Sequence, residues 1–558
     1  MPFPDGTRLA LSDLEFASCQ FPSSKSSFGR RSNVLTAAAI SKESPRKLYS
    51  LRKLAIGSSS RVIHLILLTV IGFALTPFTV HALGSEQYGL WALANAFVGY
   101  YSLLDLGLSG AVFTHMSHAI GARDHETGSR IYGTGLAIFG TLGGILIVVT
   151  VCLSVGVLLL HPGHSGMLAL IVFIVGFQTA LSFPMRAPFG VLNAGSHFEV
   201  TSAIFITSAI LRTVGTVLVL RAGKGVIGLA IVNLLAWIPG YIAVCLAVHW
   251  RYPFIRARSL KTWHPETAHK LFTFGLPVLI GQIADRIRLQ TDAMVVSFFF
   301  GLSAVAHYNV ATTLVMYYMD GVMAITGVLT PVLSMQMSAK DADGMRRSLL
   351  VGTRLAICAG GFMAFGLIAW GRPFIERWMG ASFLDAYPVL LILVLAMFFD
   401  LWQSTAVNAL YATMHQKTYA KINIAEAIAN LALSLILARR FGMIGVALGT
   451  LIPSIVVRIL IQPFVIQKKL GVRVTTYFAA SLRAIARTAL CLLLPLAVTL
   501  RWMRPDYPSL FTVGTVSLIL FALPIWYFEF HMVGSDLIFK RLRAQPDRDA
   551  SPISSTLD

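Results

Sequence analysis

One apolar stretch, residues 271–300, carries charged and amide side chains near its middle. On a helix with 100° per residue, these side chains fall within roughly 160° of one another and form a polar stripe. The stripe consists of Gln282, Asp285, Arg286, Arg288 and Asp292. At the centre of a bilayer a charge costs at least about 2.5 kcal/mol, so such groups line a wet cavity or pair with one another. We predict a substrate cavity; pairing of the two aspartates with Arg288, which only stabilises the fold, is the alternative.

Two further arginines, Arg212 and Arg458, lie near the middle of other apolar stretches. Arginine binds phosphate through paired N–H donors and keeps its charge in a low dielectric. Both residues therefore indicate a cavity for an anionic group. The alternative is an ion pair with an acid from another helix, for which the candidates are Asp320, Asp400 and Glu426.

A third polar group follows in the apolar stretch 304–335, where Asn309, Tyr317 and Asp320 stand among threonines and tyrosines. Tyrosine and asparagine suit sugar hydroxyls, so these side chains are candidates for the same cavity. Hydrogen bonds between helices are the alternative. The histidines lack the cysteine or carboxylate company of a metal site, and we predict no catalytic residue, metal or cofactor.

The elements that carry these residues are predicted to be membrane helices. Of the 558 residues, 56% are hydrophobic and 13% are charged, whereas soluble domains carry about 25% charged residues. The apolar stretches have the length of about 20 residues that a spanning helix needs. The sequence therefore predicts an all-α membrane protein with about fourteen transmembrane helices, which argues against a soluble enzyme. The predicted stretches are 62–83, 88–114, 132–160, 167–189, 199–220, 226–249, 271–300, 304–335, 349–370, 388–411, 419–438, 442–467, 478–500 and 508–531.

The basic residues predict the orientation. With the amino terminus in the cytosol, most of the 45 Lys and Arg residues fall on the cytosolic side, as the positive-inside rule requires. Both termini are then cytosolic, and the chain is a multi-pass protein of the cytoplasmic membrane. The net charge of +20 is thus a sign of topology, and we expect no nucleic-acid partner.

An internal repeat organises the helices. The segment from Gly225, GVIGLAI, resembles GMIGVAL from Gly442, which is 442 − 225 = 217 positions later. Three other matches lie in nearly the same register, so we predict two parallel six-helix repeats, as in duplicated transporters that bind substrate between their halves. The predicted parts are a disordered basic tail 1–51, the first repeat 52–250, a cytosolic linker 251–269, the second repeat 270–467, two additional transmembrane helices 468–535 and a cytosolic tail 536–558.

These features resemble a known family, the Wzx-like polysaccharide flippases of the multidrug/oligosaccharidyl-lipid/polysaccharide exporter superfamily. The resemblance rests on the repeats, on LDLGL at 104–108, on DRIRLQTD at 285–292 and on LGSEQYGLWALA at 83–94. It implies a V-shaped bundle that moves a lipid-diphosphate-linked oligosaccharide between leaflets by alternating access, for surface polysaccharides such as lipopolysaccharide. It also implies a cationic cavity, which Arg212, Arg286, Arg288 and Arg458 could supply. Candidate partners are membrane lipids, the polyprenyl-diphosphate-linked oligosaccharide, a polysaccharide polymerase and glycosyltransferases.

Two other functions stay open on the sequence. A multidrug or organic-cation antiporter of the same fold would need an acidic, aromatic cavity, and acids such as Asp285, Asp292 and Asp320 leave room for one. A membrane-embedded polysaccharide polymerase or ligase commonly carries a large external loop. The longest external loop here, 371–387, is too short to hold a folded catalytic region.

Overall fold

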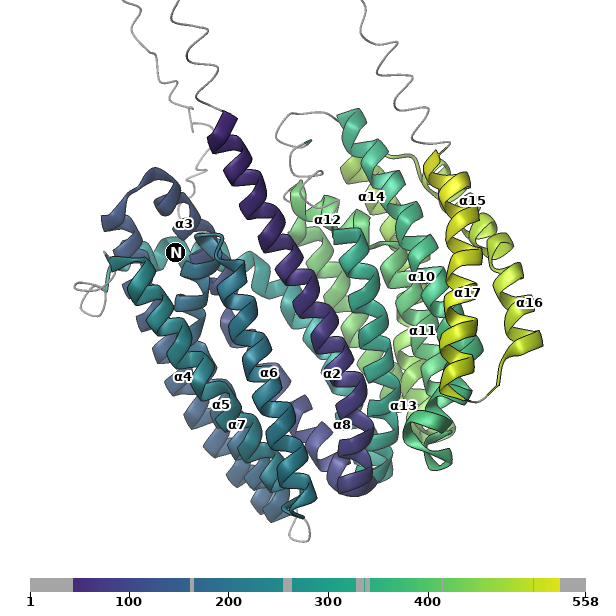
Figure 1. The fold of residues 1–558 in the computed structure, drawn as a ribbon, viewed down its shortest axis with the longest axis horizontal. Helices are drawn as coiled ribbons and strands as arrows, with labels where there is room; N and C mark the ends of the chain where they lie inside the picture. Colours follow the sequence, from purple (N-terminus) through teal and green to yellow (C-terminus); the bar gives the residue numbers. More distant parts are fainter. Residues whose placement is uncertain are drawn as a thin grey trace, which may run out of the picture. The chain divides into compact units, whose positions relative to one another are not determined.

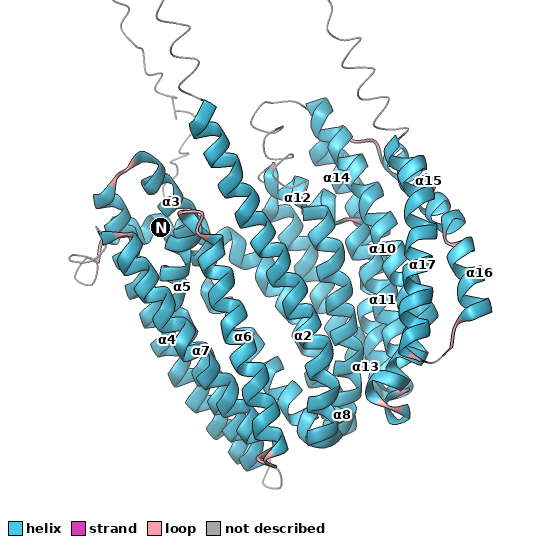
Figure 2. Ribbon diagram, in the orientation of Figure 1, coloured by secondary structure: helices cyan, strands magenta, loops and turns pink. Residues whose placement is uncertain are grey.

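The computed structural model describes residues 44–160, 165–253, 263–327, 336, 342–413, 415–504 and 506–531. Residues Ile56–Asp558 form one compact unit, and the account below concerns the described part of it. Every regular element in that part is a helix (Figure 2). The first half contains α2 (Ser44–Gly99), η1 (Tyr100–Asp105), α3 (Leu108–Ala122), α4 (His125–Leu160), α5 (Ser165–Ala194), α6 (Phe198–Arg221) and α7 (Gly225–Arg251).

The second half contains α8 (Pro265–Thr326), α10 (Ala342–Met379), η5 (Ala381–Phe383), α11 (Ala386–Trp402), α12 (Ser404–Ala412), α13 (Gln416–Ile455), η6 (Val456–Ile461) and α14 (Gln462–Leu470). The chain continues with α15 (Val474–Cys491), α16 (Leu493–Trp502), α17 (Tyr507–Ile525) and η7 (Trp526–His531). Figure 1 labels the longer helices along the chain.

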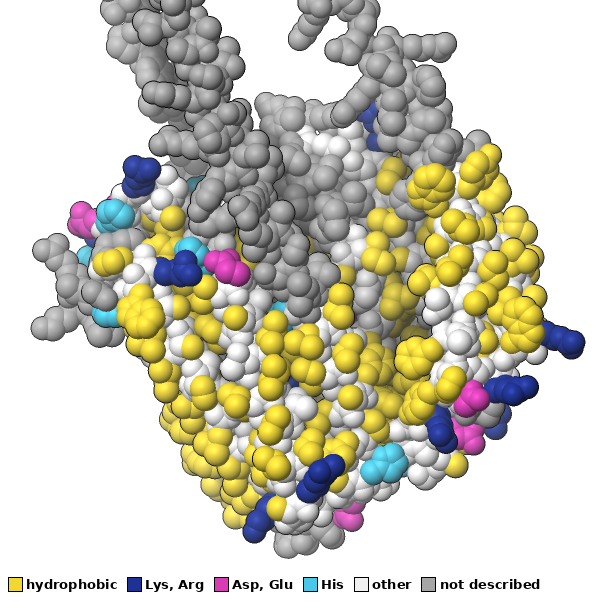
Figure 3. Space-filling view, in the orientation of Figure 1, with side chains coloured by type: hydrophobic (Ala, Val, Ile, Leu, Met, Phe, Trp, Pro, Cys, Tyr) yellow, Lys and Arg dark blue, Asp and Glu magenta, His cyan; other side chains and the backbone are white. Residues whose placement is uncertain are grey.

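The helices have the length and composition of membrane spans. Among the described residues, ten helices are long and apolar enough to cross a bilayer, or eleven if a bent pair counts as one span. Large apolar side chains face outward, such as Leu159 at 76% exposure, Phe298 at 80% and Leu500 at 79%. Figure 3 shows hydrophobic side chains covering the helix flanks, with Lys and Arg gathered towards the helix ends. The chain is therefore a multi-pass membrane protein, while the number fourteen stays a prediction.

Glycines with left-handed backbone mark the repeat. Gly84 (φ 75°) and Gly301 (φ 79°) each break a continuous helical run into two helices, in α2 and α8. They are 301 − 84 = 217 positions apart, as are Gly225 (φ 58°) and Gly442 (φ 65°). A positive φ is readily available only to glycine. Two pairs of such glycines separated by the same 217 residues are what a duplicated segment with a retained backbone conformation would contain. This agreement supports the duplication that the sequence predicts.

The first repeat packs α4 against α5, α5 against α7, and α6 against α7, side by side in Figure 1. One predicted boundary is wrong. The apolar stretch 88–114 is not one helix, because the chain turns through η1 and then through Leu106 and Gly107, both at positive φ. This turn places Asp105 at the end of η1 and starts α3 at Leu108.

The second repeat packs α10 against α11, α11 against α13, and α13 against α8. The predicted stretch 388–411 bends by 43° between α11 and α12. The additional helices lie against this repeat, with α15 packed on α10. The indole N–H of Trp402 donates to Ser481 on α15 at 2.9 Å, and that of Trp370 donates to Thr499 on α16 at 3.1 Å. Hydrogen bonds of this kind fix helices to one another in an apolar environment.

Candidate functional site

A cavity of about 320 Å³ lies between the first repeat and the second, and we call it the α2–α8 pocket. It is lined by Tyr88, Trp91, Ala92, Asn95 and Ala96 of α2, and by Gln290, Asp292, Ala293, Tyr308, Asn309, Thr312, Thr313 and Met316 of α8. The spacing of three and four residues puts each set on one helix face. The two sets come from helices that flank the equivalent glycines Gly84 and Gly301, so the pocket lies between corresponding parts of the repeats.

Hydrogen bonds order the walls of this pocket. Nδ2 of Asn309 donates to the Tyr88 hydroxyl at 2.9 Å, which joins α8 to α2. The Tyr308 hydroxyl donates to Oδ2 of Asp292 at 2.7 Å, and Thr450 of α13 donates to the same oxygen at 3.1 Å. Asp292 is only 6% exposed. Buried polar groups need such partners, so Asp292 is held in a fixed position at the pocket wall.

The repeats also touch near the glycine breaks, at what we call the Gly84–Gly301 end. The Ser303 hydroxyl donates to Ser85 at 3.0 Å. A Cβ added at Gly89 would lie 1.9 Å from the carbonyl oxygen of Leu302, so only glycine permits this close approach. The first repeat also contacts α8 through η1, where the hydroxyls of Tyr100 and Thr291 are 2.6 Å apart.

Arg212, the first of the predicted arginines, projects from α6. Its Nε is buried and makes no hydrogen bond with the described residues. Arg212 interacts electrostatically with Tyr317 of α8, and Tyr317 stacks on Phe73 of α2 with ring centroids 4.4 Å apart. Asp320 also interacts with Tyr317 and is exposed. Tyr317 thus interacts electrostatically with both Arg212 and Asp320, and it follows the pocket residue Met316 on α8.

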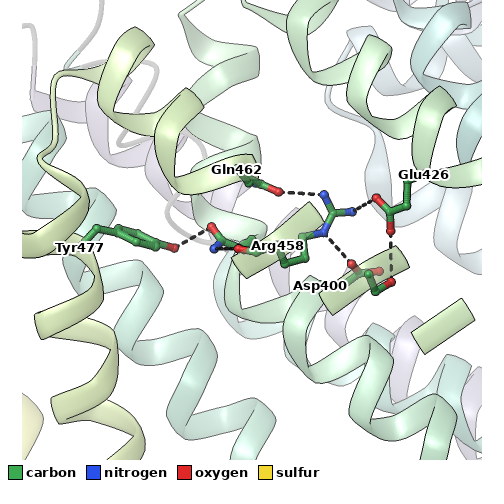
Figure 4. Close-up of polar contacts among 7 residues, drawn as sticks. Asp400, Glu426, Arg458, Gln462 and Tyr477 are labelled. Carbon is green, nitrogen blue, oxygen red and sulfur yellow. Dashed lines mark hydrogen bonds and ion pairs between the residues drawn. The ribbon is translucent and has the colours of Figure 1, made fainter. Parts of the chain in front are cut away.

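Arg458, the second of these arginines, lies in a different environment. It is 2% exposed, and its Nε donates to Asp400 at 2.7 Å while a terminal nitrogen lies 3.1 Å from Glu426. Another terminal nitrogen donates to Gln462 at 2.8 Å, as Figure 4 shows. Arg458 thus forms the interhelical ion pair that the sequence left open as the alternative, with two of its three candidate acids. It does not line the α2–α8 pocket.

The π-helical turn η6 explains how Arg458 reaches these partners. A π-helix inserts an extra residue per turn and redirects its side chains, and Arg458 lies within Val456–Ile461. The Gln403 side chain, at the α11–α12 bend, donates to the Arg458 carbonyl at 3.0 Å and accepts from Tyr477 at 2.8 Å. The side chain of Arg458 therefore joins helices to one another.

Four predicted residues, Gln282, Asp285, Arg286 and Arg288, lie on α8, but their side chains are outside the part of the chain that the structure describes. Of the polar stripe, the described member is Asp292. The pocket also contains residues that the sequence reasoning missed, chiefly Tyr88, Trp91 and Asn95. The sequence does contain a signal for these residues. Asn95 follows Trp91 by four positions within an apolar stretch, and this spacing places both side chains on one face of a helix.

A second missed feature is an ion pair between Asp105 and Arg186, which joins η1 to α5. Ser109 donates to Asp105 at 2.5 Å, and the Arg186 guanidinium lies 4.0 Å from the ring centroid of Phe183. Asp105 belongs to the LDLGL segment, so the acid of this segment forms an ion pair with Arg186.

Another pair, between His307 and Asp385, joins α8 to the residue that precedes α11, at 2.6 Å.

The comparison with known families is decisive for identity. The family model described as polysaccharide biosynthesis protein matches residues 82–388, which is more than half of the chain. The chain belongs to this family. As a polysaccharide biosynthesis protein, it is 22% identical over 516 residues to the uncharacterized membrane protein EpsK of Bacillus subtilis, covering 88% of this chain and 98% of that one. It is also 22% identical over 399 residues to a candidate O-antigen transporter of Shigella flexneri, covering 71% and 93%.

Solved structures show the fold of this polysaccharide biosynthesis protein. The lipid II flippase MurJ, in an inward closed conformation, matches with a TM-score of 0.63 at 16% identity, covering 87% of this chain and all of that one. An inward-facing MATE multidrug transporter matches with a TM-score of 0.61 at 16% identity, covering 76% and 95%. The chain therefore has the helical fold shared by MATE transporters and MurJ.

Proposed function

We propose that this protein is a flippase, which moves a polyprenyl-diphosphate-linked oligosaccharide across the cytoplasmic membrane by alternating access and catalyses no covalent reaction. The observation that carries the proposal is Arg212, whose Nε is buried in a membrane helix without a hydrogen-bond partner among the described residues. A donor nitrogen that is buried without a hydrogen-bond partner is costly. A diphosphate group supplies that partner and matches the planar N–H donors of arginine.

The α2–α8 pocket supports the same proposal. Its amides, hydroxyls and aromatic rings are the groups that bind glycans, and it lies between the two repeats, where duplicated transporters hold their substrates. The names of the relatives agree, since one is called an O-antigen transporter and a structural neighbour is a lipid II flippase.

Alternating access assigns a role to the Gly84–Gly301 end. The positive-inside pattern predicts that this end is external, with both termini cytosolic. The Ser85–Ser303 and Tyr88–Asn309 contacts then close the external side. In this scheme the substrate enters from the cytosolic leaflet, and release outside requires these contacts to separate. Reporter fusions that are active only in the cytosol, placed at each terminus, test the orientation; two active fusions are expected.

The functional test uses purified protein in liposomes with a fluorescent polyprenyl-diphosphate sugar. Replacing Arg212 by alanine removes a charge-assisted hydrogen-bond donor, worth roughly tenfold or more in rate, so we expect flipping to slow by at least about that factor. Arg212→Lys, which keeps the charge, should retain part of the rate. Arg221→Ala is the control, because Arg221 is exposed at the end of the same helix. An unchanged rate in Arg212→Ala would refute the cationic site.

A second function, export of organic cations, is favoured by one observation. The α2–α8 pocket combines the Asp292 carboxylate with the rings of Tyr88 and Trp91, a combination that attracts cations. Liposomes loaded with an organic cation such as ethidium distinguish the two functions. Efflux of the dye without any flipping of lipid-diphosphate sugars would favour the antiporter.

A further inference from the structure

We propose that the α2–α8 pocket binds the sugar residues nearest the diphosphate, and that it accepts neutral or amino sugars and rejects sugars that carry a carboxylate. This inference rests on the proposed flippase function and assigns the chemical class of the cargo. The carrying observation is a pocket whose lining combines aromatic rings, amides and hydroxyls with one buried carboxylate.

The uncharged lining suits a sugar ring. Trp91 and Tyr88 offer aromatic surfaces for the C–H face of a pyranose, and the aromatic quadrupole attracts such partly positive edges. The amides of Asn95, Gln290 and Asn309 each have donors and an acceptor for hydroxyl groups. Polar groups that converge on an apolar cavity in this way give a site its specificity.

The size of the pocket limits what it holds. Small-molecule sites occupy roughly 300–1,000 Å³, and this cavity, at about 320 Å³, is near the lower end. One or two sugar rings fit this range, and a long oligosaccharide does not. The remaining glycan must therefore lie outside the α2–α8 pocket.

The spacing along α8 connects the pocket with Arg212. Tyr317, which interacts electrostatically with Arg212, follows the pocket residue Asn309 by eight positions, or about 12 Å of helix. A diphosphate bridge followed by a pyranose ring covers a distance of this order. A substrate with its diphosphate at Arg212 would therefore place its first sugars in the α2–α8 pocket.

Charge decides which sugars are accepted. Asp292 is the one acid in the lining, and no Lys, Arg or His is among the described residues that form it. Tyr308 and Thr450 donate to the same oxygen of this carboxylate, which fixes the side chain at the pocket wall. A uronic acid would bring a second negative charge next to Asp292 and would be repelled, whereas the ammonium of an amino sugar would be attracted.

The first arm of the test measures flipping in liposomes of three fluorescent carriers: polyprenyl diphosphate alone, the same lipid with N-acetylglucosamine, and the same lipid with glucuronic acid. The wild type should flip the neutral sugar at least about tenfold faster than the acidic one. Trp91→Ala should slow the neutral sugar by about tenfold more than it slows the bare carrier, which has no sugar to stack on the ring. Asp292→Asn should reduce the preference against glucuronic acid.

Controls separate folding from recognition. Phe298→Ala changes a lipid-facing residue of the same helix α8 and should flip all three carriers like the wild type. Asn95→Ala provides a second pocket variant if Trp91→Ala does not fold, which thermal unfolding in detergent would reveal; the Asn95 amide lines the pocket and bonds to the Trp91 carbonyl of its own helix. Equal rates for the neutral and acidic sugars in the wild type, or an equal loss for all three carriers in both pocket variants, would overturn the inference.

The second arm does not depend on flipping. Binding of a neutral N-acetylglucosamine disaccharide and of a glucuronic-acid disaccharide to detergent-solubilised protein is measured by thermal shift. Binding of the neutral disaccharide that is lost in Trp91→Ala supports the pocket even if no carrier is flipped, in which case the flippase proposal fails alone. Flipping of the bare carrier without selective sugar binding leaves the flippase proposal standing and overturns the assignment of the α2–α8 pocket.

Discussion

The Tyr88 hydroxyl accepts a hydrogen bond of 2.9 Å from Nδ2 of Asn309, a residue 221 positions away in the sequence. One residue belongs to the first repeat and the other to the second. The Tyr88–Asn309 hydrogen bond and the Ser85–Ser303 contact together hold the two repeats against each other at the Gly84–Gly301 end. Any movement that opens this end must break both hydrogen bonds, so their separation is part of the free energy of opening.

Cross-linking this end should stop transport. The Oγ atoms of Ser85 and Ser303 are 3.0 Å apart, so cysteines at both positions are placed to form a disulfide. In a background without the five native cysteines, we expect oxidation of the Ser85→Cys, Ser303→Cys double variant to reduce flipping to background and reduction to restore it. Each single variant is the control. Undiminished flipping after complete oxidation would contradict alternating access at this end.

Removing Arg458 should destabilise the protein severely. Arg458→Met leaves the buried carboxylates of Asp400 and Glu426 without their shared cation. Breaking a buried pair in this way costs about 3–5 kcal/mol, so the melting temperature in detergent should fall steeply. The matched control is Arg372→Met, at an exposed position. A variant with wild-type melting but no flipping would instead place Arg458 in substrate binding.

The broken helices should not tolerate a side chain at their break. Gly301 has φ 79° and ψ −177°, a region that is essentially restricted to glycine, and a residue forced into it costs about 1–3 kcal/mol. Gly301→Ala should therefore lower the melting temperature measurably. Gly156→Ala should not, because Gly156 lies inside α4 with open space where its Cβ would point. Equal melting temperatures for Gly301→Ala and Gly156→Ala would argue against the glycine-specific conformation at Gly301.

The Asp105–Arg186 pair should show energetic coupling. Asp105→Asn and Arg186→Gln each remove one partner of a contact between η1 and α5. Residues in direct contact usually have interaction energies of about 0.5–3 kcal/mol, so the double variant should lose less stability than the sum of the single variants. Chemical denaturation in detergent measures the four proteins of the cycle. Strict additivity would show that the two residues have no interaction energy with each other.

Much of the fold could be predicted from the sequence, because its physical signals are strong. Long apolar stretches without charge predict spanning helices, and the 217-residue offset reappears in the backbone of Gly84 and Gly301. The turn through Leu106 and Gly107 could not be predicted, because an apolar composition continues across it and a single left-handed leucine leaves no pattern.

The candidate site could be predicted only in part. Asp292 and Arg212 were predicted from the cost of charged groups in a bilayer, and Asn309 and Tyr317 from the fit of their side chains to sugar hydroxyls; of these four, Asp292 and Asn309 line the α2–α8 pocket. That cost does not say how far a helix is rotated or which neighbour it meets. Arg458 illustrates the limit: its charge and depth are as informative as those of Arg212, yet the π-helical turn directs it to Asp400 and Glu426.

The attachment of α15 to the α11–α12 bend has a practical consequence. Because Trp402 bonds to Ser481 and Gln403 to Tyr477, α15 must travel with the second repeat whenever the repeats rock apart. A spin label at the outward-facing Leu482 of α15, paired with one at the outward-facing Leu218 of α6, would form a spectroscopic ruler across the molecule. Neither label would touch the pocket or the contacts that open, so the transport cycle could be followed in an otherwise unaltered site.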